Sequence, residues 1–221
     1  MESLPAALAL AIDVVLHLNA YLADWTTKYG VWIYAILFLV VFAETGLVVT
    51  PFLPGDSLLF VAGSIAAAGG MDVHLLVFLL IVAAILGNTT NYEIGRVVGR
   101  RYFTDVQSRW LNPAHLQRTH EFFERWGPAA VVVARFVPFL RTYVPFVAGL
   151  GAMPRIRYFA YTAFGAVTWV ASLVYLGYAF GNIPWIKQNQ GLLVIGIVVL
   201  SLIPVAVGFI RARAGAPTKA P

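Results

Sequence analysis

The chain contains no cysteine, few charged residues and few histidines, and each shortage excludes a class of function. Without cysteine among its 221 residues, it can form no disulfide bond, thiolate metal site or cysteine nucleophile. The four histidines form no carboxylate-histidine zinc motif, so we expect neither a metal nor a cofactor. Charged residues make up only 11% of the chain, against about 25% in a typical soluble domain.

Apolar residues and positive charge dominate what is present. Hydrophobic residues make up 60% of the chain and the mean hydropathy is +0.81, which predicts an all-α integral membrane protein. The net charge of +5 gathers in a central segment and at the C-terminus, in Arg96, Arg100, Arg101, Arg109, Arg118, Arg125, Arg211, Arg213 and Lys219. The positive-inside rule places both regions in the cytoplasm. Because this charge borders membrane segments, it favours anionic lipid as a partner over nucleic acid.

Long apolar runs and their interruptions predict the helices. We expect an N-terminal helix over 4–25, hairpins over 31–70 and 128–153, an amphipathic connecting helix over 100–127, and spanning helices over 73–98, 158–180 and about 191–211. Together they would form a single transmembrane domain over residues 1–213, followed by a disordered tail over 214–221.

Two of the apolar runs are interrupted by charged residues and prolines, which are costly inside a membrane. The first interruption is acidic and contains Glu44, Pro51, Pro54, Gly55 and Asp56. The second is basic and contains Arg135, Pro138, Arg141, Pro145 and Gly149. We interpret each run as a re-entrant helical hairpin, which enters the membrane and returns on the same side. The prolines and glycines would break the helices and shape the backbone.

The two halves of the chain resemble each other. Val61-Ala62-Gly63 matches Val147-Ala148-Gly149, and Tyr92-Glu93-Ile94-Gly95 matches Tyr178-Ala179-Phe180-Gly181, at one shared offset of 86 residues (149 − 63 and 178 − 92). We predict two repeats, about 31–99 and 128–181, each made of a hairpin and a transmembrane helix. With the central arginines in the cytoplasm, the first hairpin opens outward and the second inward. The repeats would therefore be inverted, as in many secondary transporters.

The residues of the two hairpins resemble the DedA family of bacterial membrane proteins, within the SNARE-associated or VTT-domain superfamily. The likeness is carried by Glu44, Phe52-Leu53-Pro54-Gly55-Asp56, Asn91-Tyr92-Glu93-Ile94-Gly95-Arg96 and, above all, the run from Arg135 to Gly149. It implies a transporter of the bacterial inner (cytoplasmic) membrane that flips undecaprenyl phosphate or a related phospholipid, coupled to the proton gradient. The family's functional acids fall on Glu44 and Asp56 and its functional arginines on Arg135 and Arg141. The chain departs from the family at Asn88, where many members have aspartate.

The chemistry of these residue types fits those roles. Guanidinium groups stay protonated and bind phosphate oxygens in a fork, so Arg135 and Arg141 are the candidate residues for binding a lipid phosphate. Glu44 and Asp56 are the candidate proton-coupling residues, because protonation would release carboxylate-arginine pairs and free the arginines. Trp169 is expected to be an ordinary core or interface aromatic.

Other functions remain open. A proton- or sodium-coupled ion antiporter could use Glu44 and Asp56 alone, and a general phospholipid scramblase would share the arginines. The four charges could also pair only to hold the hairpins together. An enzyme is not expected, since no histidine lies near either hairpin. The expected partners are a polyprenyl phosphate or phospholipid and the membrane, with a homo-oligomer left open.

Overall fold

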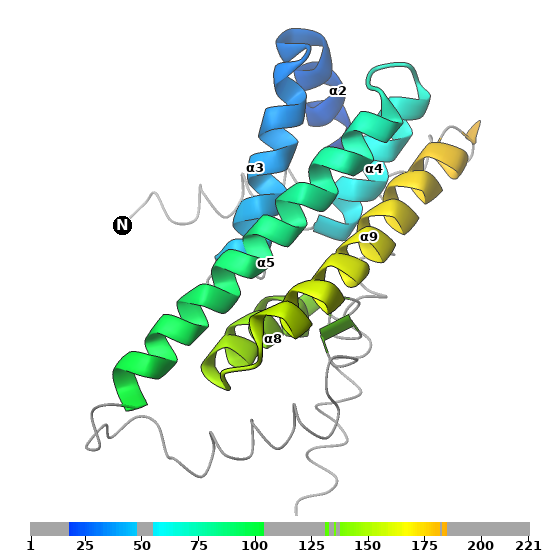
Figure 1. Cartoon of the computed structure of the whole chain (residues 1–221). Coiled ribbons are helices and arrows are strands. Elements are labelled where there is room, and N and C mark those ends of the chain that lie inside the picture. Colours follow the sequence, from blue (N-terminus) through cyan, green and yellow to red (C-terminus); the bar gives the residue numbers. More distant parts are fainter. Residues whose placement is uncertain are drawn as a thin grey trace, which may run out of the picture.

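A computed structural model of the chain describes residues 18–47, 55–103, 131–132, 135, 138–181 and 183–184 (Figure 1). Each labelled element in this part is a helix. The helices are α2 (Leu18–Tyr29), α3 (Trp32–Gly46), α4 (Gly55–Ala67), α5 (Val73–Phe103), α8 (Pro138–Leu150) and α9 (Arg155–Phe180). The all-α class is confirmed for these residues. Nearly all of the predicted connecting helix and the whole predicted C-terminal helix lie outside them.

Helices α3 and α4 correspond to the first predicted hairpin. α3 is apolar until Glu44 and Thr45 in its last turn, and the backbone becomes extended at Leu47. After α4, the backbone N–H of Asp72 donates a hydrogen bond of 2.7 Å to the hydroxyl of Tyr34, in the first turn of α3. The chain therefore returns to the end of the bundle at which α3 begins (Figure 1).

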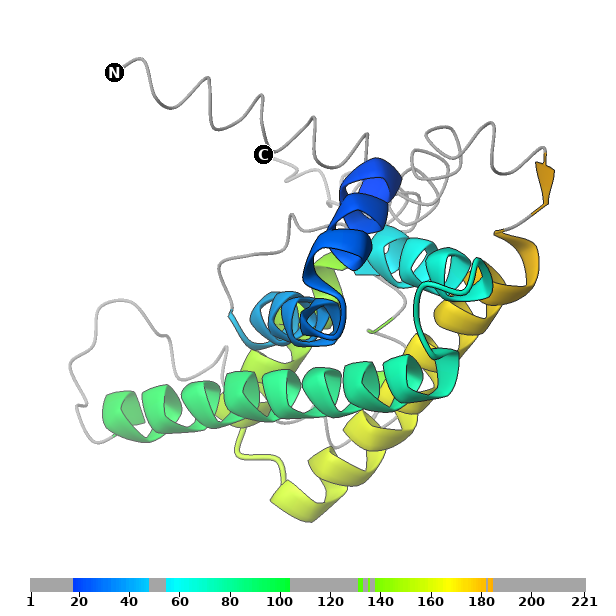
Figure 2. The same cartoon turned by 90° about the horizontal axis from the view of Figure 1, so that it is seen from above.

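Helices α5 and α9 are the two long helices of the described part, and they run antiparallel. His74, at the start of α5, forms a 2.9 Å hydrogen bond with Tyr175 near the end of α9. Further along, the hydroxyl of Tyr158 donates to the carbonyl oxygen of Asn88 at 3.0 Å. The two helices contact each other and cross at an angle in the view from above (Figure 2). Their apolar parts span 27 and 26 residues, which exceeds the roughly 20 residues needed to cross a bilayer.

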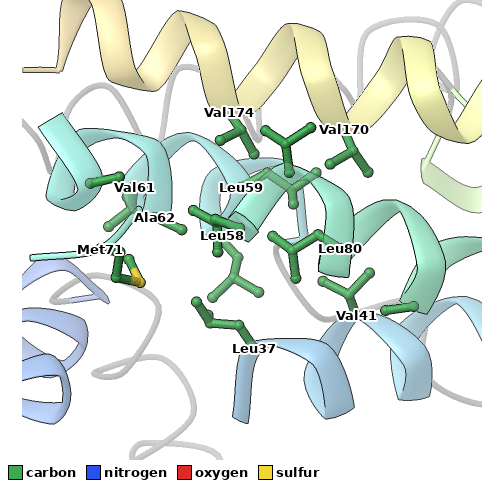
Figure 3. Close-up of a cluster of buried hydrophobic side chains, with 14 of the residues drawn as sticks. Leu37, Val41, Leu58, Leu59, Val61, Ala62, Met71, Leu80, Val170 and Val174 are labelled. Atoms are coloured by element: carbon green, nitrogen blue, oxygen red, sulfur yellow. The ribbon is translucent and has the colours of Figure 1, made fainter. Parts of the chain in front are cut away.

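One apolar core joins α3, α4, α5 and α9 (Figure 3). It includes Leu37 and Val41 of α3, Leu58, Leu59 and Ala62 of α4, Leu80 of α5, and Val170 and Val174 of α9. The core fixes the α3–α4 pair against the two long helices. This position determines where the polar ends of α3 and α4 lie.

Helices α4 and α9 approach each other closely through two glycines. A Cβ atom on Gly63 would lie 2.1 Å from the carbonyl oxygen of Val174. A Cβ atom on Gly177 would lie 2.0 Å from the carbonyl oxygen of Phe60. Small residues at a membrane helix crossing allow this backbone contact. Each helix therefore places a glycine against the backbone of the other.

Helices α5 and α8 cross in the same way. A Cβ atom on Gly149 would lie 2.0 Å from the carbonyl oxygen of Tyr92, and one on Gly95 would lie 2.1 Å from that of Phe146. Gly149 thus corresponds in its contacts to Gly63, as the sequence match predicts. The contact of Gly95 corresponds to that of Gly177. The sequence match had instead paired Gly95 with Gly181, which lies one helical turn after Gly177. That part of the alignment was wrong by four residues, because short matches between two helices do not fix which turn makes the contact.

Helix α8 corrects one expectation about the second hairpin. Pro145 was expected to break the helix, but it lies inside α8 and is buried. Proline removes one intrahelical hydrogen bond, to the carbonyl of Arg141 four residues earlier. In membrane helices, packing against neighbours permits such an interruption, and α8 packs along α5. Pro138 occupies the first position of α8, where its fixed φ angle suits a helix.

Candidate functional site

Arg141, near the start of α8, forms ion pairs with two carboxylates from the other half of the chain. Its Nη2 donates to Oε1 of Glu44, in the last turn of α3. Its Nη1 donates to Oδ1 of Asp56, in the first turn of α4, at 2.7 Å. The side chains of Arg141, Glu44 and Asp56 are only 3%, 1% and 19% exposed. Charges buried to this extent require partners, so these three residues form one electrostatic unit.

Gly55, the first residue of α4, leaves room for the side chain of Glu44. A Cβ atom on Gly55 would lie 2.0 Å from Oε2 of Glu44. A larger residue at this position would force the carboxylate to shift. The sequence predicts a structural role for Gly55. In the structure, this role is to make room for the buried carboxylate of Glu44.

Trp169 of α9 belongs to the same cluster, although nothing in the sequence distinguishes it from an ordinary core aromatic. Its indole Nε1–H donates to Oδ1 of Asp56 at 2.8 Å. The guanidinium carbon of Arg141 lies 4.6 Å from the centroid of its ring, within cation–π distance. The side chain therefore contacts both members of one ion pair.

Arg135 lies apart from these ion pairs. Its side chain is buried, and its Nη2 donates to the carbonyl oxygen of Thr162 at 3.0 Å. In the part of the chain that the structure describes, its Nε and Nη1 have no hydrogen-bond partner. Gly165 makes room for it, since a Cβ atom there would lie 2.8 Å from Cδ of Arg135. The two arginines predicted to act together thus have different partners.

Asn91 of α5 connects the two segments that carry the ion pair. Its side-chain amide donates to the carbonyl oxygen of Thr45 at 3.2 Å and to that of Thr142 at 2.9 Å. These residues directly follow Glu44 and Arg141. The sequence does contain a signal for this residue, because an amide in the middle of a long apolar helix is unusual. It does not indicate which backbone groups the amide contacts.

The remaining predicted residues have structural positions or lie outside the described residues. Gly149 forms part of the α5–α8 crossing, and Pro138 and Pro145 lie at the start and in the interior of α8. Pro51 and Pro54 are outside the described part of the chain.

An open groove of about 470 Å³ runs along the second half of α5, away from the buried ion pairs. It is lined by Thr89, Thr90, Glu93, Ile94, Val97 and Val98. Glu93 also forms a two-pronged ion pair with Arg155, with N–O distances of 2.7 and 2.9 Å. This pair is largely exposed, unlike that of Arg141.

Comparison with known proteins gives a consistent family assignment. The family model of the VTT domain matches residues 53–179. Protein DedA of Escherichia coli (strain K12) is 47% identical over 207 residues, which cover 93% of this chain and 94% of DedA. The chain belongs to the DedA family of VTT-domain membrane proteins. Inner membrane protein YqjA of the same strain is 35% identical over 179 residues, 80% of each chain. An uncharacterized membrane protein of Mycobacterium leprae (strain TN) is 38% identical over 165 residues, 75% of this chain and 74% of the relative.

The matched region of this DedA-family protein contains most of the cluster. Residues 53–179 include Asp56, Asn91, Arg135, Arg141 and Trp169, whereas Glu44 precedes them. No solved structure matches the chain. The resemblance seen in the sequence is therefore confirmed at the level of the family.

Proposed function

We propose that this DedA-family protein moves a phosphorylated lipid across the bacterial cytoplasmic (inner) membrane, with undecaprenyl phosphate as the first candidate substrate. The observation that carries the proposal is that the two buried arginines differ in their hydrogen-bond partners. Arg141 is held by two carboxylates, and Arg135 keeps two donor groups without a partner among the described residues.

The arginines suit a lipid phosphate. A phosphate that leaves water needs donors that remain charged, and guanidinium binds its oxygens in a fork. Arg135 would bind the phosphate first, through Nε and Nη1, because no carboxylate among the described residues has to be displaced from it.

The carboxylates would couple this binding to protons. Glu44 and Asp56 compete with phosphate for Arg141 as long as both are ionised. A proton taken up from outside would neutralise one of them and weaken its ion pair. Arg141 would then join Arg135 at the phosphate. In this mechanism the ion-paired arrangement is the state without lipid.

The architecture that we propose for transport is a pair of inverted repeats with two re-entrant hairpins. It is supported by the antiparallel α5 and α9, by the return of the chain after α4 to the start of α3, and by the matched glycine crossings. The central basic segment and the C-terminus would face the cytoplasm. The hairpins would then open to opposite sides and expose the arginines alternately.

A second candidate is a proton- or sodium-coupled antiporter, and the nearly complete burial of the Glu44 carboxylate favours it. Vesicle experiments separate the two. The purified protein is placed in vesicles with or without undecaprenyl phosphate, and both transbilayer lipid movement and cation-driven proton flux are followed. Lipid movement that requires the protein supports the proposal. Cation-driven proton flux without any lipid movement rejects it in favour of the antiporter.

The lipid class is tested in the same vesicles. Movement of phosphatidylethanolamine as fast as that of undecaprenyl phosphate would indicate a general phospholipid scramblase. Native mass spectrometry of the protein purified from its own membrane provides a second measurement. Retention of a polyprenyl phosphate by the parent protein, and its loss in Arg135→Ala, is the expected result.

A further inference from the structure

We infer that Asn91 is a positioning residue, whose side-chain amide holds the acidic and basic segments in the relation that allows Glu44 to pair with Arg141. The inference deepens the proposed function and rests on it for the effect on transport. The structural part stands on hydrogen bonds and burial alone.

The side-chain NH2 group of Asn91 donates one hydrogen bond to the acidic segment and one to the basic segment. One hydrogen bond reaches the carbonyl of Thr45 and the other reaches that of Thr142, at 3.2 and 2.9 Å. Both acceptors are backbone atoms in the residues directly after Glu44 and Arg141. A change at Asn91 therefore acts on the position of the charged groups without removing a charge.

The end of α3 has a specific need for this donor. The last four carbonyl groups of a helix have no intrahelical partner, and Thr45 lies in the last turn of α3. Asn91 supplies a donor from α5, which packs against both α3 and α8. Helix α5 thus serves as a common support, and the amide sets how the end of α3 and the start of α8 lie against it.

The burial of Asn91 argues against a role in packing alone. The side chain is 0% exposed, and its Oδ1 has no hydrogen-bond partner in the described part of the chain. An unsatisfied buried oxygen is unfavourable, whereas leucine at this position would fill space without it. The two donated hydrogen bonds are the property that leucine lacks.

Asn88 provides a matched control one turn earlier on the same helix. It is buried almost as completely, at 1% exposure, but its amide donates to Ala84 within α5. A substitution at Asn88 therefore changes a buried amide of α5 without touching a hydrogen bond of that amide to α3 or α8.

A distance measurement tests the inference without any transport assay. Because the chain has no cysteine, spin labels can be attached to Leu47→Cys and Leu140→Cys, two exposed positions on the two segments. We expect a narrow distance distribution in the otherwise unchanged chain and in Asn88→Leu. Asn91→Leu, or Asn91→Asp should the leucine variant not fold, is expected to give a broader or shifted distribution. An unchanged distribution in the folded Asn91 variant would overturn the inference.

A pH profile tests the consequence for transport. An ionised aspartate at position 91 faces two carbonyl oxygens with no donor, whereas a protonated one can donate a single hydrogen bond. The charged groups of the ion-pair unit, Glu44 on α3, Asp56 on α4 and Arg141 on α8, are the same in every variant. Lipid movement by Asn91→Asp should fall by about tenfold or more at high pH and recover as the pH falls, while Asn88→Leu, which adds no titratable group, should follow the pH profile of the parent.

The distance measurement and the pH profile distinguish a failure of the positioning role from a failure of the proposed transport function. If Asn91→Asp follows the parent profile at every pH, the positioning role is contradicted. If the parent protein moves no lipid at all, the proposed function fails, and the spin-label distances still decide whether Asn91 holds the segments together.

Discussion

Glu44 and Arg141 form a buried ion pair although 97 residues separate them in the sequence. Glu44 ends α3 and Arg141 lies near the start of α8, so the pair exists only when both halves of the chain have folded onto α5. Asp56 and Trp169 extend the unit to α4 and α9. Three charged residues and one tryptophan therefore connect four helices.

Removal of the Glu44 carboxylate should lower the stability of the folded protein. Glu44→Ala leaves Arg141 with Asp56 as its remaining carboxylate partner, and breaking a buried pair typically costs about 3–5 kcal/mol. We expect a clearly lower melting temperature in lipid nanodiscs. The control is Glu93→Ala, which removes an exposed ion pair with Arg155 and should cost at most about 1 kcal/mol. Equal losses in the two variants would contradict the assigned burial.

The glycine crossing between α5 and α8 gives a second prediction. In Gly95→Ala the new methyl group would lie 2.1 Å from the carbonyl oxygen of Phe146, so the helices must separate. Such overpacking costs about 1–3 kcal/mol. In Gly99→Ala, one turn later, the nearest atom is 3.1 Å away, and the higher helix propensity of alanine offsets a small adjustment. Thermal unfolding should rank Gly99→Ala close to the parent and Gly95→Ala well below it; the reverse order would reject the crossing.

Gly165 allows Arg135 to be moved without loss of its charge. In Gly165→Ala the methyl group would lie 2.8 Å from Cδ and 2.9 Å from Nε of Arg135. Because these atoms belong to a flexible side chain, the guanidinium should shift and the fold should survive. Binding of undecaprenyl phosphate, measured by native mass spectrometry, should weaken nearly as much as in Arg135→Ala. The exposed substitution Thr168→Ala on the same helix should leave it unchanged, and full binding by Gly165→Ala would show that the position of Arg135 is unimportant.

Trp169 and Asp56 should be energetically coupled. Trp169→Phe retains an aromatic ring beside Arg141 but removes the N–H that donates to Asp56. A hydrogen bond to a charged group contributes about 1.5–3 kcal/mol. In a double-mutant cycle with Asp56→Asn, the free energies of unfolding should be non-additive by about 0.5 kcal/mol or more. Simple additivity would mean that the hydrogen bond makes no net contribution.

The sequence singles out four charged residues, of which the structure brings three together, and it does not single out the neutral residues that join them. Glu44, Asp56 and Arg141 stand out because lipid tolerates no unpaired charge, so opposite charges in two apolar runs must meet. Asn91 and Trp169 carry no such requirement. Their roles depend on which turn of a long helix faces which backbone carbonyl or carboxylate, and that is fixed only by packing.

The sequence also did not predict two details of helix packing. The sequence match paired Gly95 with Gly181 as repeat positions, whereas the glycine of α9 with the corresponding close contact is Gly177. Pro145 was expected to end a helix, but packing of α8 on α5 outweighs the hydrogen bond that proline removes.

Transbilayer movement of undecaprenyl phosphate, followed in vesicles that contain the purified protein, measures the proposed transport itself. The parent protein should move the lipid, and faster when the outside is acidic. Arg141→Ala, present in equal amounts and correctly folded, should abolish the movement. Full activity in Arg141→Ala would contradict the phosphate-binding role of Arg141, and no movement by the parent protein would contradict the account as a whole.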